Sequence, residues 1–453
     1  MNYDWQHTDT ICAPATAAGG AIGVIRISGS QTFNIIQKLL SCDIKEWQAN
    51  TAHFALIHNG EDIVDEVVIT VFHAPHSYTG EDSAEISCHG SRYIMNKVLE
   101  LLVSQGCRMA NPGEYTQRAF MNGKMDLSQA EAVADLIASS NSASHKVSMS
   151  QLRGHFSTEL SMLRDQLLHL TSLLELELDF SDHENLEFAD RKELNVLAHR
   201  IQDRITTLSH SFQTGKAIKE GVPVAIIGKT NVGKSTLLNR LLHDDKAIVS
   251  DIHGTTRDVI EDTTVINGVT FRFIDTAGIR NTSDKIEQMG IERTYATIDK
   301  AKIILWLIDD NPSADELSDI LSRSKDKSLI IVRNKIDKDD APLSDNKEQK
   351  TVYISAKYDI GIESLENEIF QAADIPEISE NDVIVTNIRH FDALRLAAAD
   401  IQRVIDGLEA GISGDLLSED LRSCIHHLAD IVGGEITPNE TLSTIFERFC
   451  VGK

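Results

Sequence analysis

The sequence lacks long apolar runs and is poor in cysteine. No apolar run reaches the roughly 18 residues that a membrane-spanning helix needs, and the start, MNYDWQHTDT, has neither the basic nor the apolar region of a signal peptide. The six cysteines are Cys12, Cys42, Cys88, Cys107, Cys424 and Cys450, with no C-x-x-C pair among them. Scattered thiols fit a reducing compartment better than a disulfide framework. We therefore expect a soluble, cytoplasmic protein.

Basic residues are scarce as well. The chain has 43 Lys and Arg against 69 Asp and Glu, which gives a formal net charge of −26. A field of this sign repels polyanions. If the protein acts on a nucleic acid, a local basic patch or a partner must supply much of the phosphate contact.

The 453 residues suffice for about three domains at roughly 150 residues each. Residues 1–120 mix strands and helices, with two strands expected around the Asn59-Gly60 turn and a helix that ends at Gly106. Residues 121–215 carry apolar residues at helical spacing, which predicts bundle helices. The two apolar stripes are Leu160, Leu163, Leu167, Leu170 and Leu174, and then Leu194, Leu197, Ile201, Ile205, Leu208 and Phe212.

Residues 216–375 have a different pattern. The short apolar runs PVAIIG, FRFIDTAG, KIILWLID, SLIIVRNK and VYISAK are separated by helix-length segments. Such runs are typical of parallel strands that are buried on both faces of a doubly wound sheet. Helical spacing returns in residues 376–453. The predicted fold class is multidomain α/β, with an α+β N-terminal domain, a discontinuous helical-bundle domain, and a doubly wound domain inserted between the two helical segments.

A phosphate-binding loop opens the inserted domain. GKTNVGKS, residues 228–235, matches G-x-x-x-x-G-K-[ST] between an expected strand and an expected helix. Backbone N–H groups of such a loop cradle phosphates, Lys234 reaches the β- and γ-oxygens, and Ser235 ligates Mg²⁺. GTTRD then offers Thr256 as a second Mg²⁺ ligand, and DTAG places Asp275 near the metal.

The base-recognition stretches point to guanine. In NKID, the Asp337 carboxylate accepts hydrogen bonds from guanine N1–H and the 2-amino group, whereas adenine leaves that carboxylate unsatisfied. SAK, residues 355–357, is the expected last loop on the base side. Together these motifs predict a P-loop GTPase domain. The predicted nucleotide-binding residues are Gly228, Asn231, Val232, Gly233, Lys234, Ser235, Thr236, Asp275, Thr276, Ala277, Gly278, Asn334, Lys335, Asp337, Ser355, Ala356 and Lys357.

DTAGIR, residues 275–280, departs from the usual switch. In Ras-like proteins a glutamine often follows D-x-x-G and orients the attacking water. Ile279 holds that place here, and an aliphatic side chain cannot position water. Either the protein hydrolyses nucleotide poorly, or the catalytic group comes from another part of the chain.

The chain resembles the MnmE (TrmE) family of tRNA-modification GTPases from DTICAPAT to FCVGK. The resemblance rests on PHSYTGEDSAEISCHG, NPGEYTQRAFMNGKMDLSQAEAVADLI, the nucleotide motifs, and GTTRD followed by DTAGIR. It implies a homodimeric GTPase in which potassium, bound when two G domains meet, replaces an arginine finger. The implied potassium ligands are Asn231, Ser250, Ile252 and Thr255. Glu287 then orients the attacking water.

The resemblance also implies a second site in the N-terminal domain. Family members bind a reduced folate, 5-formyl- or 5,10-methylene-tetrahydrofolate, and the matching positions are Arg26, Glu85, Lys124 and Lys453. A carboxylate suits the pterin N–H groups, and cations suit the glutamate tail. In FCVGK, Cys450 is open to two interpretations, a reactive thiol or a packed residue that fixes the tail.

The function that the resemblance implies is addition of a carboxymethylaminomethyl or aminomethyl group to C5 of the wobble uridine of certain tRNAs, together with an FAD-dependent MnmG (GidA) type subunit in a heterotetramer. One alternative is a regulatory RNA- or ribosome-binding GTPase without modification chemistry. Another is a folate-dependent transferase with a vestigial nucleotide domain, against which the intact Lys234 and Asp275 argue. Cys424 and His427 share a helix face but are too few for a zinc site.

Overall fold

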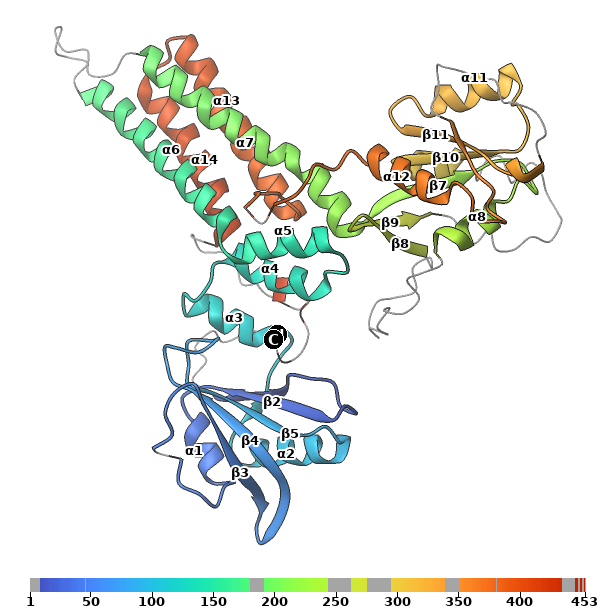
Figure 1. Cartoon of the computed structure of the whole chain (residues 1–453). Helices are drawn as coiled ribbons and strands as arrows, with labels where there is room; N and C mark the ends of the chain where they lie inside the picture. The colour runs from blue at the N-terminus through green and yellow to red at the C-terminus, as the bar shows by residue number, and fades with distance from the viewer. Residues whose placement is uncertain are drawn as a thin grey trace. The chain divides into compact units, whose positions relative to one another are not determined.

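The computed structural model describes residues 9–44, 46–179, 191–242, 262–274, 295–338, 351–379 and 381–433, and also Ile445, Phe446, Phe449 and Gly452. The chain divides into two compact units (Figure 1). Residues 1–137, 151–203 and 393–453 form the first unit, and residues 138–150 and 204–392 form the second. None of the helices in the described parts combines the length and the apolarity needed to cross a membrane.

The first unit contains a six-stranded sheet of order β3-β4-β5-β2-β1-β6, in which only β1 and β6 pair in parallel among the described strands. Its strands are β1 (Ile11–Pro14), β2 (Ile22–Ser28), β3 (Thr51–Asn59), β4 (Asp62–Phe72), β5 (Ser83–His89) and β6 (Arg108–Met109). The predicted hairpin around Asn59-Gly60 is confirmed, with Asn59 paired to Asp62. Alternating apolar residues bury one face of the sheet, and this alternation sets the strand register.

Two helices pack on that buried face, α1 (Thr32–Gln37) and α2 (Arg92–Ser104). Helix α2 ends at Ser104, and the chain turns at Gly106, whose φ of +112° suits a residue without a Cβ. Helix α3 (Glu114–Met121) follows β6 and is almost wholly buried. It carries the polar network described below.

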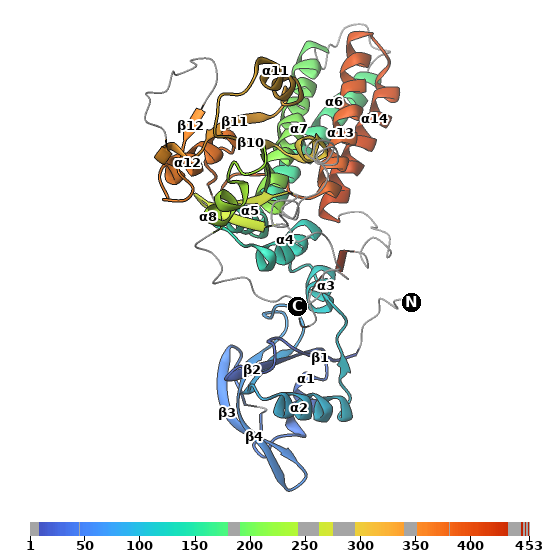
Figure 2. The same ribbon diagram turned by 90° about the vertical axis from the view of Figure 1, so that its right-hand side faces the viewer.

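The bundle of the first unit is built from long amphipathic helices. They are α4 (Leu127–Ala138), α5 (Ser142–Leu152), α6 (His155–Asp179), α7 (Arg191–Glu220), α13 (Ile388–Glu409) and α14 (Gly414–Val432), of which α4, α5, α7 and α13 contribute to both units. Helices α6 and α14 run side by side in both views (Figures 1 and 2). The predicted stripe of α6 is buried from Leu160 to Leu174, which confirms that it is core.

The second unit contains the doubly wound sheet, of order β12-β11-β10-β7-β9-β8. Its strands are β7 (Val222–Ile227), β8 (Asp262–Ile266), β9 (Val269–Phe273), β10 (Ile303–Ile308), β11 (Ser328–Arg333) and β12 (Thr351–Tyr353). All neighbours pair in parallel except β8, which pairs antiparallel with β9 at the edge. The inserted α/β domain is therefore confirmed, and β8 is the strand that the apolar runs did not reveal.

Both faces of this sheet are covered. One face packs on α8 (Lys234–Leu241) and α12 (Ile362–Ala372), and the other on residues 295–300 and α11 (Ala314–Arg323). In β10, Leu305 points into the first core and Trp306 into the second. Alternate burial on both sides explains why the strands read as continuous apolar runs.

A short piece of the helical segment belongs to the same unit as the sheet. Asn141 caps the start of α5 by accepting from the Ser144 N–H (2.8 Å), and its amide donates to Thr270 Oγ1 (2.7 Å). The Ala143 N–H donates to the Gly268 carbonyl (3.2 Å) at the tip of the β8–β9 hairpin. These contacts anchor the hairpin to the start of α5.

Candidate functional site

The phosphate-binding loop leaves the carboxyl end of β7 and enters α8. Gly228 and Gly233 have φ values of +147° and +101°, which side chains other than glycine rarely allow. A Cβ on Gly228 would collide with the Leu307 carbonyl of the neighbouring strand, and a Cβ on Gly233 would collide with the Asn334 amide. The loop therefore needs glycine at both positions, for backbone conformation and for space.

Lys234 closes this loop on itself. Its Nζ donates to the carbonyls of Gly228 (2.7 Å) and Lys229 (2.6 Å), and burial lowers its pKa. Ser235 is partly exposed and Thr236 exposed, in the first turn of α8, where backbone N–H groups are free to face an anion. Asn231 is exposed, with a φ of +62°. The structure thus brings the predicted phosphate-side residues 228–236 to one edge of the sheet.

Asn334 joins that loop to the base side. It is 4% exposed, its Nδ2 donates to the Val232 carbonyl (2.8 Å), and its Oδ1 accepts from the Ala356 N–H (3.0 Å). A buried amide with a partner on each side fixes both loops, because losing one bond would leave a buried polar group unsatisfied. The structure therefore brings these parts of three predicted motifs together.

The predicted guanine carboxylate is held in place by the last loop. Ser355 is fully buried and its Oγ donates to Asp337 Oδ1 (2.6 Å), while the Asp337 side chain itself is exposed. Lys335 Nζ pairs with Asp309 Oδ2 (2.6 Å), and this hydrogen bond holds the pKa of Asp309 below its usual range. Asp309 is the last residue of the run KIILWLID. The sequence did not predict that it pairs with Lys335, because an acidic residue at the end of a strand is common and has no distinctive pattern.

Several predicted residues lie outside the described residues. They are Ser250, Ile252, Thr255, Thr256, Asp275, Thr276, Ala277, Gly278, Glu287, Cys450 and Lys453. Their roles stay predictions.

In the first unit, Arg26 and Glu85 are cross-strand partners on β2 and β5. Arg26 Nε and Nη2 both donate to Glu85 Oε1 (3.0 and 2.7 Å), and the two side chains are 22% and 32% exposed. The guanidinium lies 5.6 Å from the ring centres of both Tyr78 and Tyr115, and its Nη1 donates to the Gly452 carbonyl (3.3 Å). The pair is a half-buried, hydrogen-bonding site with an aromatic wall.

Lys124 contacts the loop that carries Tyr78. Its Nζ donates to the Pro75 carbonyl (2.9 Å), and burial raises the pKa of Tyr78, whose hydroxyl shares a hydrogen bond with Thr116 Oγ1 (2.9 Å). One loop, residues 75–78, thus touches both Lys124 and the Arg26–Glu85 pair.

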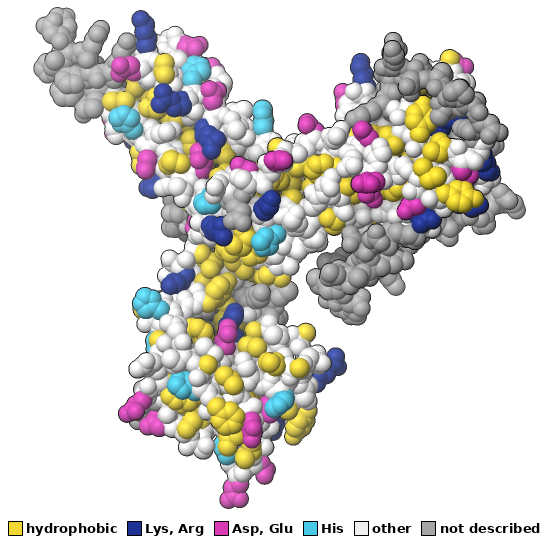
Figure 3. Space-filling view, viewed as in Figure 1, with side chains coloured by type: hydrophobic (Ala, Val, Ile, Leu, Met, Phe, Trp, Pro, Cys, Tyr) yellow, Lys and Arg dark blue, Asp and Glu magenta, His cyan; other side chains and the backbone are white. Residues whose placement is uncertain are grey.

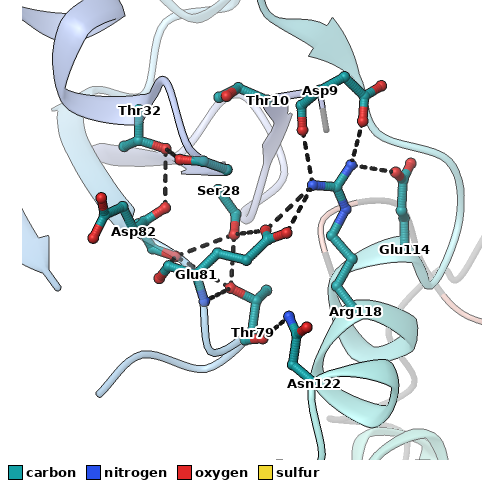
Figure 4. A network of polar contacts seen from close by, with 12 residues as sticks. Asp9, Thr10, Ser28, Thr32, Thr79, Glu81, Asp82, Glu114, Arg118 and Asn122 are labelled. Carbon is teal, nitrogen blue, oxygen red and sulfur yellow. Dashed lines mark hydrogen bonds and ion pairs between the residues drawn. The ribbon is translucent and has the colours of Figure 1, made fainter. Parts of the chain in front are cut away.

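A buried arginine forms a network with three carboxylates in the same unit (Figure 4). Arg118 on α3 is 3% exposed and pairs with Asp9 (2.8 Å), Glu81 (3.2 Å) and Glu114 (3.0 Å). Glu81 also accepts from Ser28 Oγ (2.7 Å). Burial raises the pKa of Glu114, but the hydrogen bonds and charges of the neighbouring arginines outweigh it and leave that pKa below its usual value. Arg118 was not predicted, because its partners become neighbours only in the fold.

A P-loop that is tied through Asn334 to a guanine-type base loop, on a doubly wound sheet, defines a P-loop GTPase domain, here inserted in a larger chain. Two family models cover that chain. The model described as "GTP-binding protein TrmE N-terminus" matches residues 10–124, and the "MnmE helical domain" matches residues 127–450.

The curated relatives agree over the whole length. The tRNA modification GTPase MnmE of Bacteroides fragilis is 55% identical, with 98% of this chain and 99% of the relative covered. The proteins of the same name from Phocaeicola vulgatus and Cytophaga hutchinsonii are 54% and 48% identical, with 98% and 99% of this chain and 99% and 98% of the relatives covered. Among solved structures, the G domain of the T. maritima FeoB iron transporter covers 34% of this chain and 99% of its own at 25% identity, with a TM-score of 0.25.

The chain belongs to the MnmE (TrmE) family of tRNA modification GTPases. The predicted family, fold class and GTPase function are confirmed.

Proposed function

We propose that this GTPase acts with an FAD-dependent, MnmG-type partner to add a carboxymethylaminomethyl or aminomethyl group to C5 of the wobble uridine of certain tRNAs. The carbon comes from a folate one-carbon unit bound by the N-terminal domain. The observation that carries the proposal is 55% identity to a tRNA modification GTPase over 98% of the chain. We keep the domain limits 1–120, 121–215, 216–375 and 376–453 as part of it.

On the phosphate side, we assign Lys234 to the β- and γ-oxygens. To reach them, its ammonium must leave the Gly228 and Lys229 carbonyls, and burial favours that exchange because a desolvated cation gains more from a phosphate than from neutral carbonyls. The hydroxyls of Ser235 and Thr256 suit Mg²⁺, a cation that prefers oxygen ligands. On the base side, Asp337 accepts from the guanine edge.

For GTP hydrolysis, a potassium ion and Glu287 would take over the catalytic role of the glutamine that the sequence lacks. Oxygen donors from Asn231, Ser250, Ile252 and Thr255 suit a potassium ion, which would neutralise developing charge between the β- and γ-phosphates. The exposed amide of Asn231, on a loop residue with a φ of +62°, fits this donor set. Glu287 orients the water.

On the folate side, Glu85 offers carboxylate oxygens to pterin N–H groups, and Arg26, Lys124 and Lys453 supply positive charge. The Arg26 and Glu85 side chains are 22% and 32% exposed, so a ligand has access to them. Tyr78 offers an aromatic wall beside the pair. Cys450 is kept with both of its roles open, a reactive thiol or a packed anchor.

The partners follow from the charge balance. On the face drawn in Figure 3, the Lys and Arg side chains of the described residues are interspersed with Asp and Glu instead of gathered into one patch. With a net charge of −26, tRNA contact is best supplied in large part by the MnmG-type subunit. We propose a homodimer through the N-terminal domains, assembled with that subunit into a heterotetramer.

GTP turnover in potassium and in sodium tests the nucleotide part of the proposal. We expect potassium to accelerate hydrolysis by at least about tenfold, because its positive charge would stabilise the negative charge that develops between the β- and γ-phosphates. The rate per molecule should rise with protein concentration, since two G domains must meet. Equal rates in both salts would contradict the potassium site.

Titration with 5-formyltetrahydrofolate tests the N-terminal site. We expect Glu85→Gln to weaken binding by about 10- to 100-fold, because it removes a charged acceptor and leaves Arg26 without its charged partner. Glu66→Gln, an exposed acid on the adjacent strand β4, is the matched control and should bind like the parent protein. Absence of binding by the parent protein would instead favour a regulatory RNA- or ribosome-binding GTPase.

A further inference from the structure

Arg240 lies on α8, behind the last loop of the base site. Its Nε donates to the Ala356 carbonyl (3.1 Å) and its Nη2 donates to the Lys357 carbonyl (3.0 Å). Within the described part of the chain these two carbonyls are its hydrogen-bond acceptors, and it forms no ion pair there. A guanidinium that spans two consecutive peptide groups fixes their orientation better than a single donor does.

The front of the same loop is fixed by other residues. The Ala356 N–H donates to Asn334 Oδ1 (3.0 Å), and Ser355 Oγ donates to Asp337 Oδ1 (2.6 Å). Ser355 and Ala356 are fully buried, while Lys357 is exposed. The Lys357 N–H has no acceptor among the described residues, so it is a backbone donor directly after the carbonyl that Arg240 holds.

The guanine edge shows why the orientation of this loop affects recognition. If the carboxylate of Asp337 takes N1–H and the 2-amino group, the O6 acceptor lies next to N1 on the same edge and needs a donor. The loop 355–357 is tied to Asp337 through Ser355, and its Ser355 and Ala356 N–H groups already donate to Ile360 and Asn334, which leaves the Lys357 N–H as its donor. A loop fixed before binding loses less conformational entropy when the base arrives.

We propose that Arg240 is a positioning residue for guanine recognition, which holds loop 355–357 so that the Lys357 N–H meets O6. The inference rests on the proposed GTP-binding role. Arg240 stands on the helix whose first turn carries Lys234 and Ser235, and therefore one short helix serves both ends of the nucleotide. Loss of Arg240 should then lower the affinity for the guanine base without changing the rate of the chemical step at the γ-phosphate.

The test compares three diphosphates by displacement of a fluorescent GDP from the full-length protein with Mg²⁺. GDP has O6, N1–H and the 2-amino group, 2-aminopurine riboside diphosphate keeps the 2-amino group but lacks O6 and N1–H, and ADP has a 6-amino group and no 2-amino group. Each variant is therefore compared with the parent protein on the same ligand. For Arg240→Met we expect GDP to bind about tenfold more weakly. The 2-aminopurine analogue should change less than about twofold, since it has no O6 for the loop to meet. Arg240→Lys keeps the positive charge but cannot donate to both carbonyls in the same way, so its affinity for GDP should lie between those of the parent protein and Arg240→Met.

Two further measurements separate positioning from a general structural effect. In Arg240→Met the KM for GTP should rise while kcat at saturation stays within about twofold. Asn239→Ala, an exposed neighbour on α8, should leave all affinities unchanged. Equal loss of GDP and of the 2-aminopurine analogue, or no loss of either, overturns the role of Arg240. A parent protein that binds ADP as tightly as GDP contradicts the proposed function itself.

Discussion

Replacing Arg118 with methionine should destabilise the N-terminal domain by about 3–5 kcal/mol, which is the usual cost of removing one partner from a buried ion pair. The arginine is 3% exposed and Glu114 is 1% exposed, so the Glu114 carboxylate cannot simply be hydrated in its absence. Native-state hydrogen exchange of peptides from β2 and β5 in the full-length protein measures the free energy of unfolding of this domain separately from the rest of the chain.

A matched control is Lys97→Met, which removes an ion pair with the mostly exposed Glu100 in the same unit and should cost less than about 1 kcal/mol. The triple variant Arg118→Met, Glu81→Gln, Glu114→Gln should recover part of the loss, since no buried charge remains unpaired. A small effect of Arg118→Met, equal to that of Lys97→Met, would show that the network does not stabilise the domain.

The network also sets the acid stability of this domain. The folded-state pKa values of Glu114 and Asp9 are both depressed, despite burial, by their hydrogen bonds to Arg108 and Arg118. Their contribution is therefore fully present above the unfolded pKa, near 4, and is lost as the pH falls through the lower folded value. In Arg118→Met this acid-induced loss should be shallower, and that change in slope is a second readout of the same substitution.

Patterns that lie within one short segment were readable from the sequence, and contacts between distant segments were not. The P-loop was predicted because its glycines, Lys234 and Ser235 occupy eight consecutive positions between a strand and a helix. The edge strand β8 was missed because an antiparallel edge is buried on alternate residues and does not form an apolar run.

The helical stripes show the same limit at the level of single residues. In α7, Ala198 is fully buried while Leu197 is only partly buried, so the stripe steps by four residues from Leu194 where the sequence suggested three. Both spacings belong to one helix face, and the neighbouring helices decide between them.

The polar network around Arg118 in the N-terminal domain could not be predicted from the sequence, because its members are far apart along the chain. Arg118 is 37 positions from Glu81 and 109 from Asp9, and no local period relates them. The stretches that carry the family resemblance, SYTGEDS and NPGEYTQRAFMNGK, contain Glu81 and Arg118. The sequence does not indicate that they interact, and only the fold shows that Arg118 pairs with Glu81.

The substitution Gly233→Ala should weaken GTP and GDP binding by roughly 30- to 700-fold. A φ of +101° costs a non-glycine residue about 1–3 kcal/mol, and the added Cβ would displace the Asn334 amide, whose bond to the Val232 carbonyl is worth about 1 kcal/mol. Together they amount to about 2–4 kcal/mol, at 1.4 kcal/mol per tenfold. Isothermal titration of the full-length protein with GDP and Mg²⁺ measures the change.

The control Gly60→Ala has a similar φ sign (+66°) in the β3–β4 turn, with open space around the new Cβ, and should leave nucleotide affinity unchanged. A double-mutant cycle with Asn334→Ala locates the cause. If the Cβ acts by displacing the Asn334 amide, the combined loss must be smaller than the sum of the single losses, because Asn334→Ala removes the group it strikes. Strictly additive losses would mean that backbone strain at Gly233 acts alone, and affinity within twofold of the parent would contradict both causes.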